Sequence, residues 1–139
     1  MAGLIAGTIF GIWIGYNPKN LSAPAYVELQ QMAIRSLNTL MPLLGLITII
    51  LTITSALLQK ENQTVLITLL IAAVLLIAAG LVTRFGNQPI NKIVMTWDKT
   101  SVPGNWTGLR DKWWSFHIVR SVATILAFCL IIWANMRKD

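Results

Sequence analysis

The sequence predicts an all-α integral membrane protein, an antiparallel four-helix bundle with an additional interfacial helix between spans three and four. Of its 139 residues, 55% are hydrophobic and only 12% are charged, which is too apolar for a soluble domain of this size. Three runs are long enough to cross a hydrocarbon core of about 30 Å as helices: Leu40 to Leu58, Val65 to Val82 and Trp114 to Trp133. A shorter run, Ala2 to Tyr16, holds no charged residue and is predicted to be the first span. Residues 1–139 would form one multi-pass transmembrane domain, expected in the bacterial inner membrane.

The formal net charge of +6 is explained by interaction with membrane lipids and not with nucleic acid. Lys and Arg stand at the ends of the predicted spans, where anionic headgroups attract them. Most of them flank the end that carries the long loop, so the positive-inside rule places this loop in the cytoplasm. The first residues lack the basic start of a secretory signal peptide, so the first run is interpreted as a retained span.

The first span carries a ridge of glycines at every fourth position: Gly3, Gly7, Gly11 and Gly15. Such spacing flattens one helix face and lets a neighbouring backbone approach closely. Two interpretations stay open. The ridge packs against another helix of the same bundle, or it meets a flat ligand, a second copy of the chain or a partner subunit of a membrane complex.

A polar stripe leads into the second span. Four residues share one helix face: Glu28, Gln31, Arg35 and Asn38. Pro42 follows, and the helix is expected to kink there and continue into the membrane. The stripe is either a solvated interface or the wall of a polar cavity within the bundle. Glu28 would be the carrier carboxylate if the protein were a proton-coupled exporter.

The region after span three is rich in helix-ending signals. Gly86 suits a helix C-cap, and Asn87 suits the start of a short interfacial helix with Pro89 in its first turn, running to about Trp97. The stretch that follows, as far as Gly108, contains Pro and Gly and is predicted to be a loop.

A last helix is predicted from near Trp106 to about Met136. One of its faces carries aromatic and polar side chains at steps of three or four residues: Trp106, Arg110, Trp113, His117, Arg120 and Thr124. Arg120 is expected inside the membrane boundary, where a guanidinium is costly unless it meets an anion or a polar cavity. His117 is suited to take a proton near neutral pH, and Arg120 would stabilise the resulting oxyanion. The plainer interpretation is an interfacial Arg, a structural His and Trp side chains of the membrane interface.

Metal chemistry has little support. A single His and the lone Cys129 make neither a zinc site nor a di-iron bundle, so no metal site and no cofactor is predicted. A haem with His117 as its one axial ligand stays open. The sequence has no phosphate-binding loop, nucleophile elbow or dinucleotide fingerprint.

A series of features runs through most of the chain: Gln31 and Asn38 ahead of Pro42, Asn87-Gln-Pro-Ile-Asn91, Trp97, Trp106, Trp113 and His117-x-x-Arg120. In this order and spacing the chain resembles the anthrone oxygenase-like family of small four-helix membrane proteins. The resemblance implies that Asn87, Asn91, Trp113, His117 and Arg120 converge on one site. It also implies a cofactor-independent oxygenase that converts polyketide anthrones to anthraquinones with molecular oxygen.

The function predicted on this basis is a membrane oxygenase or oxidase for a flat phenolic, anthrone- or quinone-like molecule. The catalytic residues would be His117, Arg120, Asn91 and Asn87, and the substrate-binding residues Trp113, Trp106, Trp97, Arg110, Gln31, Arg35 and Asn38. The expected partners are a small aromatic substrate, molecular oxygen and membrane lipids. The alternative is a non-catalytic structural, quinone-binding or lipid-binding subunit of a larger membrane complex.

Overall fold

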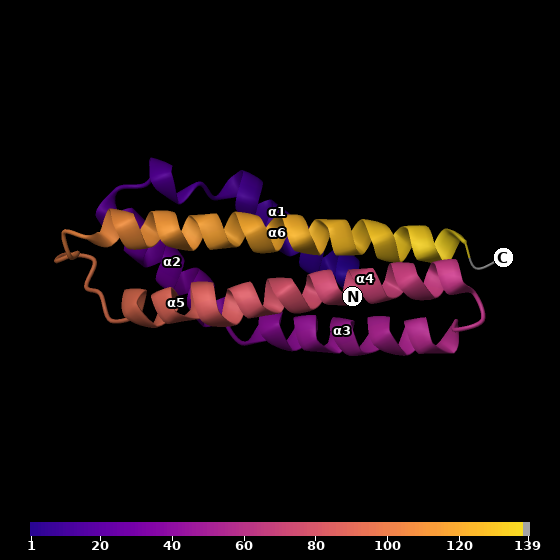
Figure 1. Ribbon diagram of the computed structural model, residues 1–139. Helices are drawn as coiled ribbons and strands as arrows, with labels where there is room; N and C mark the ends of the chain where they lie inside the picture. Colours follow the sequence, from indigo (N-terminus) through magenta and orange to yellow (C-terminus); the bar gives the residue numbers. More distant parts are fainter. Residues whose placement is uncertain (138–139) are drawn as a thin grey trace.

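The computed structural model describes residues 1–137, which are almost entirely helical. The elements are α1 (Ala2–Gly15), a 3-10 turn (Pro18–Asn20), α2 (Ala23–Leu37), α3 (Leu40–Leu58), α4 (Gln63–Val82), a π-helical turn (Thr83–Asn87), α5 (Gln88–Val94) and α6 (Trp106–Met136). Figure 1 shows α4 and α6 side by side along the long axis, with α3 against α4 and with α1 and α2 behind. The predicted all-α class is confirmed for the described residues.

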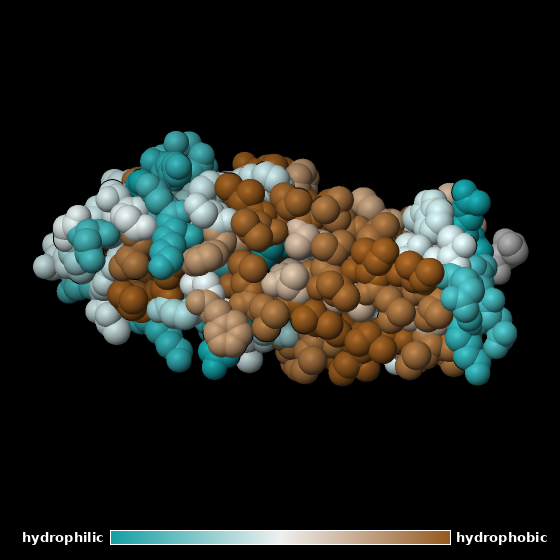
Figure 2. Space-filling view, viewed as in Figure 1, coloured by the Kyte–Doolittle hydropathy of each residue, from teal (hydrophilic) through white to brown (hydrophobic). Residues whose placement is uncertain are grey.

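Three helical segments are long and apolar enough to cross a membrane: α3, α4 together with α5, and α6. Their outer faces carry large apolar side chains, such as Leu43, Leu57 and Val74, each more than half exposed. In Figure 2 these faces form a hydrophobic band between two hydrophilic ends. Such a surface is suited to lipid and not to water. The chain is an integral membrane protein.

Small residues let the spans pack closely. Ala56, Ala72, Ala127 and Ala134 are completely buried where α3, α4 and α6 meet. In lipid the hydrophobic effect does not hold helices together, so their association depends on van der Waals contacts between closely packed backbones. A second, larger cluster lies toward the loop end, where aromatic side chains from α2 and α6 pack together with α5.

The first helix is shorter than the other three spans. α1 has 14 residues, or about 21 Å of helix, and its N-terminal end lies level with Phe128, partway along α6 (Figure 1). A Cβ on Gly3 would lie 3.1 Å from the Phe128 ring, so this glycine does serve close packing. A Cβ on Gly7, Gly11 or Gly15 would meet nothing within 4 Å. A bundle of four full spans is therefore not confirmed.

The predicted C-cap at Gly86 is wrong, whereas the predicted helix with Pro89 in its first turn is present as α5 but is continuous with α4. α4 continues through the π-helical turn into α5 as one helix, Gln63–Val94. Pro89 has no N–H and its ring crowds the carbonyl four residues earlier. The chain accommodates it by widening the turn, so that the N–H of Gln88 donates to the carbonyl of Thr83, five residues back. Gly86 has a different purpose: a Cβ there would lie 2.7 Å from Cγ of Phe116 on α6.

Two smaller boundaries differ from the sequence prediction. The helix that carries the polar stripe, α2, ends at Leu37, and a two-residue break precedes Leu40, so Pro42 sits in the first turn of α3 and not in a kink. Proline is tolerated in that turn because few helical hydrogen bonds are lost. α5 ends at Val94, three residues before the predicted Trp97, whereas α6 begins at Trp106 as predicted.

Candidate functional site

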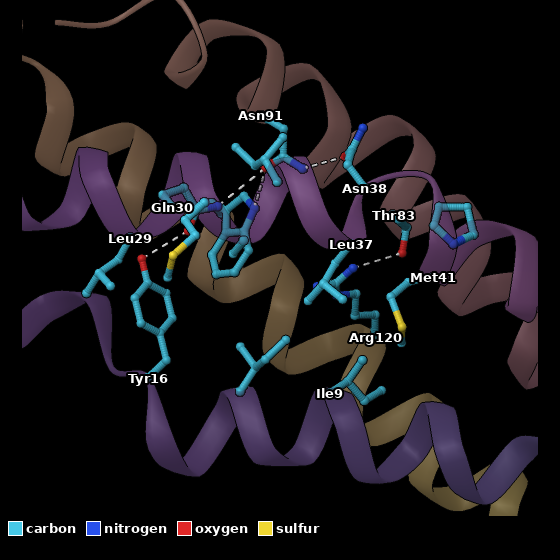
Figure 3. A pocket seen from close by; sticks show the side chains of 16 residues that line it. Ile9, Tyr16, Leu29, Gln30, Leu37, Asn38, Met41, Thr83, Asn91 and Arg120 are labelled. Carbon is cyan, nitrogen blue, oxygen red and sulfur yellow. Dashed lines mark hydrogen bonds between the residues drawn. The ribbon is translucent and has the colours of Figure 1, made fainter. Parts of the chain in front are cut away.

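A cavity of about 240 Å³ lies between α1, α2, α6 and the helix formed by α4 and α5. Most of its wall is apolar. Its polar groups come from every one of these helices and converge on one region: Tyr16, Gln30, Asn38, Thr83, Asn91, Trp113 and Arg120. Figure 3 shows the labelled members of this set pointing toward one another across the cavity. A mainly apolar cavity with a few convergent polar groups is the usual form of a small-molecule site.

The side chain of Asn91 is the centre of a hydrogen-bond network. Its Oδ1 accepts from Nε1 of Trp113 at 2.8 Å and from Nε2 of Gln30 at 3.5 Å, and its Nδ2 donates to Oδ1 of Asn38 at 2.8 Å. The hydroxyl of Tyr16 donates to Oε1 of Gln30 at 3.0 Å. The network joins α1, α2, α5 and α6, and it fixes the orientation of each amide that faces the cavity.

Arg120 lies on the cavity wall with hydrogen-bonding capacity to spare. Its Nη2 and Nε lie 2.9 and 3.3 Å from Nδ1 of His117, and its Nη1 donates to Oγ1 of Thr83 at 3.4 Å. A guanidinium has five N–H groups, so these contacts leave two without a protein acceptor. No carboxylate of residues 1–137 forms an ion pair with Arg120. A half-buried cation at membrane depth without a counter-charge is costly, and it favours an anionic or strongly polarised oxygen beside it.

His117 lies directly behind Arg120 and is completely buried. Its ring stacks on Trp113, with centroids 5.2 Å apart, and on Trp114 at 5.4 Å. Because Nδ1 accepts hydrogen bonds from a guanidinium, the imidazole is neutral in this state and carries its proton on Nε2. His117 is not part of the cavity wall. It holds Arg120 in place and reaches the cavity through that side chain.

Asn87 is buried in the π-helical turn, one layer away from the cavity. Its Nδ2 donates to the carbonyl of Trp113 at 3.0 Å, while its Oδ1 has no partner among the described residues. The amide ties the turn to α6. The structure thus brings Asn91, Trp113, Arg120 and Asn38 to the cavity and sets His117 and Asn87 just behind its wall.

The other residues predicted to bind substrate lie nearer the loop end and do not line this cavity: Trp97, Trp106, Arg110, Gln31 and Arg35. The guanidinium of Arg110 covers the Trp106 ring at 4.9 Å. Nε2 of Gln31 donates to the carbonyls of Val94 and Trp97, at 2.9 Å each, and so holds α2 against the end of α5.

The polar stripe of α2 is therefore divided between two environments: Asn38 lines the cavity, whereas Glu28 and Arg35 do not. Glu28 and Arg35 lie at the surface, beside a hollow that also contains Lys99. There Oε1 of Glu28 pairs with Nζ of Lys99 at 3.4 Å. Glu28 is thus far from being a carboxylate enclosed in the bundle, which is the environment that an exporter would need.

Three polar residues of the wall were not predicted: Tyr16, Gln30 and Thr83. Gln30 is adjacent to the predicted Gln31 and is almost completely buried, a position that glutamine rarely takes without hydrogen-bond partners. Tyr16 and Thr83 stand where α1 ends and where α4 gives way to the wide turn. Polar residues at the ends of apolar helices were the one feature of the sequence that could have indicated these two positions.

A family model described as anthrone oxygenase matches residues 30–130. The chain belongs to the anthrone oxygenase family. The segment shared with the family contains Gln30, Asn38, Thr83, Asn91 and Arg120, whereas Tyr16 precedes it. Searches among curated proteins and among solved structures found no match.

In this member of the anthrone oxygenase family, the described residues offer no group of three or more His, Cys, Asp or Glu side chains that could hold a metal ion. The haem interpretation gains nothing from the geometry around His117 either. Its imidazole is stacked between two indoles and engaged by Arg120, and it does not face the cavity. The chemical resources of the site are a cation, a neutral imidazole behind it, amides and aromatic rings.

Proposed function

We propose that this protein is a membrane oxygenase for a flat phenolic or anthrone-like molecule, and that the anion of the substrate itself reduces molecular oxygen. The observation that carries the proposal is the guanidinium of Arg120, which has two free N–H groups and no carboxylate partner among residues 1–137. An apolar cavity suits a flat ring system. The cation on its wall would lower the free energy of an enolate or phenolate oxygen within it.

The reaction starts with the loss of a proton from the carbon opposite the carbonyl of an anthrone-type substrate. The negative charge moves to the carbonyl oxygen, where Arg120 donates two hydrogen bonds to it. The electron-rich carbanion then reduces molecular oxygen and forms a carbon–oxygen bond, giving a hydroperoxide. Loss of water from this hydroperoxide converts the original CH2 group into a second carbonyl. One molecule of oxygen thus yields one quinone carbonyl and one molecule of water.

His117 is the proposed proton acceptor. The cavity wall contains no carboxylate, and Nδ1 of His117 lies 2.9 Å from Nη2 of Arg120. His117 does not face the cavity in this state, so the proposal includes a movement of Arg120: when its N–H groups turn to the substrate oxyanion, they uncover the lone pair on Nδ1, which then accepts the proton. The same proton then passes to the peroxide oxygen and completes the hydroperoxide, and the second hydrogen of the original CH2 group leaves as a proton that combines with the departing hydroxide as water.

Asn91 and Trp113 are proposed to position the substrate ring. The indole of Trp113 lines the cavity beside Arg120, with the guanidinium 6.0 Å from the ring centroid. A flat aromatic ligand can stack on an indole ring. The amide network around Asn91 can accept or donate one further hydrogen bond to a phenolic hydroxyl, which would set the orientation of the ring.

The test is oxygen uptake by the protein in lipid nanodiscs with dithranol, a dihydroxyanthrone, measured against protein-free nanodiscs. Arg120→Gln should lower kcat/KM by about 100- to 1000-fold, the usual effect of removing an oxyanion-stabilising donor. Arg137→Gln is the matched control, because Arg137 lies at the far end of α6 against Trp133. Equal activity of wild type and Arg120→Gln would refute the proposal.

A second variant separates proton transfer from positioning. In His117→Gln, an amide oxygen can still accept a hydrogen bond from Arg120 but cannot take up a proton. We expect kcat to fall by about 100-fold or more with little change in KM. Retention of wild-type kcat would show that His117 only holds Arg120 in place.

A further inference from the structure

A second cavity, of about 250 Å³, lies on the other side of Arg120. The two cavities share Ile9, Met41, Thr83 and Arg120 in their walls. The second one extends from this shared region toward the middle of the membrane-spanning part of the molecule, between α1, α3, α4 and α6. The guanidinium therefore stands at the junction of two adjoining spaces and not at the closed end of one.

Apart from Thr124, the polar residues of the second cavity are Arg120 and three residues of the π-helical turn and its end, Thr83, Arg84 and Gln88. Away from these residues the wall consists of side chains such as Leu46, Ile49 and Leu76. The one hydroxyl at that depth, on Thr124, donates to the carbonyl of Arg120 within the same helix at 2.8 Å and offers its hydrogen to no ligand. A polar ligand would lose its hydration there without compensation, so the space suits an aliphatic chain.

Glycines keep this cavity open from two sides. Gly45 on α3 and Gly80 on α4 both line it, and a Cβ on either would meet nothing within 4 Å. Gly80 and Leu46 are also exposed on the lipid-facing surface. The cavity is thus accessible from the bilayer, at the level of the apolar band seen in Figure 2.

We infer that the substrate is an amphiphilic phenol that carries an apolar chain and enters sideways from the bilayer. Its aromatic head would occupy the first cavity, with an oxygen at Arg120, and its chain would extend into the second cavity between Gly45 and Gly80. This inference rests on the proposed function for the head group, and it adds the substrate class and the route of entry. A compact, water-soluble aromatic compound would leave the second cavity unused.

Binding is tested without oxygen, so that the outcome does not depend on turnover. The probes are orcinol and olivetol, which share a resorcinol ring and carry a methyl group and a pentyl chain. Affinities are measured by quenching of tryptophan fluorescence in nanodiscs. In Gly80→Leu the preference for olivetol over orcinol should fall by about tenfold relative to wild type, because the new side chain fills the space of the chain. Partitioning into the lipid is the same for both proteins and cancels.

Gly7→Leu is the matched control, since Gly7 is an exposed helical glycine with open space around it and lines neither cavity. Its preference should equal that of wild type. Gly45→Leu, on the opposite wall, repeats the test should Gly80→Leu fold poorly. An unchanged preference in a folded variant, or equal weakening of both probes, would overturn the inference.

A labelling experiment on the wild-type protein does not depend on any variant. A resorcinol with a diazirine at the end of its alkyl chain should label peptides that contain Gly45 or Gly80, and excess olivetol should suppress the labelling. Even labelling of all lipid-facing surfaces, without suppression, would mean that the chain stays in the bilayer. The proposed function would fail separately, if dithranol oxidation proved independent of Arg120.

Discussion

The tightest surroundings of any glycine in the chain, those of Gly86, give the sharpest prediction about stability. Gly86, in the π-helical turn, faces the ring of Phe116 on α6. A Cβ added at Gly86 would lie 2.7 Å from Cγ, 2.8 Å from Cδ2 and 3.0 Å from Cδ1 of that ring. Rotation of the ring about the Cβ–Cγ bond leaves Cγ in place, so a ring flip cannot relieve this contact. The variant Gly86→Ala must therefore push the two helices apart or force the Phe116 side chain into another χ1 rotamer.

Two opposing effects set the size of the change. Alanine is favoured over glycine inside a helix by about 1 kcal/mol. Overpacking a close contact costs about 1–3 kcal/mol. The control Gly108→Ala, in the first turn of α6, has open space around the new Cβ and shares the favourable effect of alanine. The difference between the two variants should therefore approach the overpacking term, with Gly86→Ala less stable by about 1–3 kcal/mol.

The assay is unfolding in mixed dodecyl sulfate micelles, followed by circular dichroism. Phe116→Leu combined with Gly86→Ala should recover much of the loss, because a smaller side chain leaves room for the new methyl group. Equal stability of Gly86→Ala and Gly108→Ala would refute the idea that this glycine exists for close helix contact. Failure of Phe116→Leu to rescue would point to another cause of the loss.

Two further predictions concern α2. Tyr26→Phe should leave the free energy of unfolding unchanged or raise it by about 1 kcal/mol, because the buried hydroxyl of Tyr26 has no partner among residues 1–137. Burial raises the pKa of Tyr26 from its ordinary value of 10.0 to about 12. The folded state thus favours the neutral phenol over the phenolate. The free energy of unfolding of wild type should therefore be highest below pH 10 and should fall as the pH rises toward 12. Tyr26→Phe has no phenol to ionise and should not show this fall. Gln31→Leu should cost about 1–2 kcal/mol, since it removes the donor that joins α2 to the carbonyls of Val94 and Trp97; an unchanged unfolding midpoint would contradict this.

Apolar run length predicted the membrane-spanning helices well. α3 begins and ends at the expected Leu40 and Leu58, because an uninterrupted apolar stretch of that length has few alternatives to a helix in lipid. The face of α6 that carries Trp113, His117 and Arg120 was also visible in the sequence, since periodicity fixes which residues share a face. Periodicity did not show where along the helix the cavity begins, so Trp106 was grouped with residues that lie deeper.

The remaining features depend on tertiary packing. Helix-ending signals at Gly86 and Pro89 were correctly noticed, but the neighbouring α6 supplies contacts that carry the helix past them. Likewise Tyr16 and Gln30 reach the cavity only because α1 and α2 fold back over α6. No pattern within one helix contains that information. The prediction of α1 as the first span relied on its lack of charged residues, although the run was already recognised as shorter than the others.

The π-helical turn gives this region an unusual relation to chain length. It holds one residue more than a regular turn, because its hydrogen bond closes over five residues. Removing one residue between Thr83 and Asn87 would restore regular winding and leave the helix on either side at nearly the same rotation, so Asn91 would still face Trp113 and Asn38. A deletion elsewhere in α4 or α5 would instead turn every downstream side chain by about 100° around the axis. Among relatives that share the site, we therefore expect one-residue gaps in this helix to fall within these five positions.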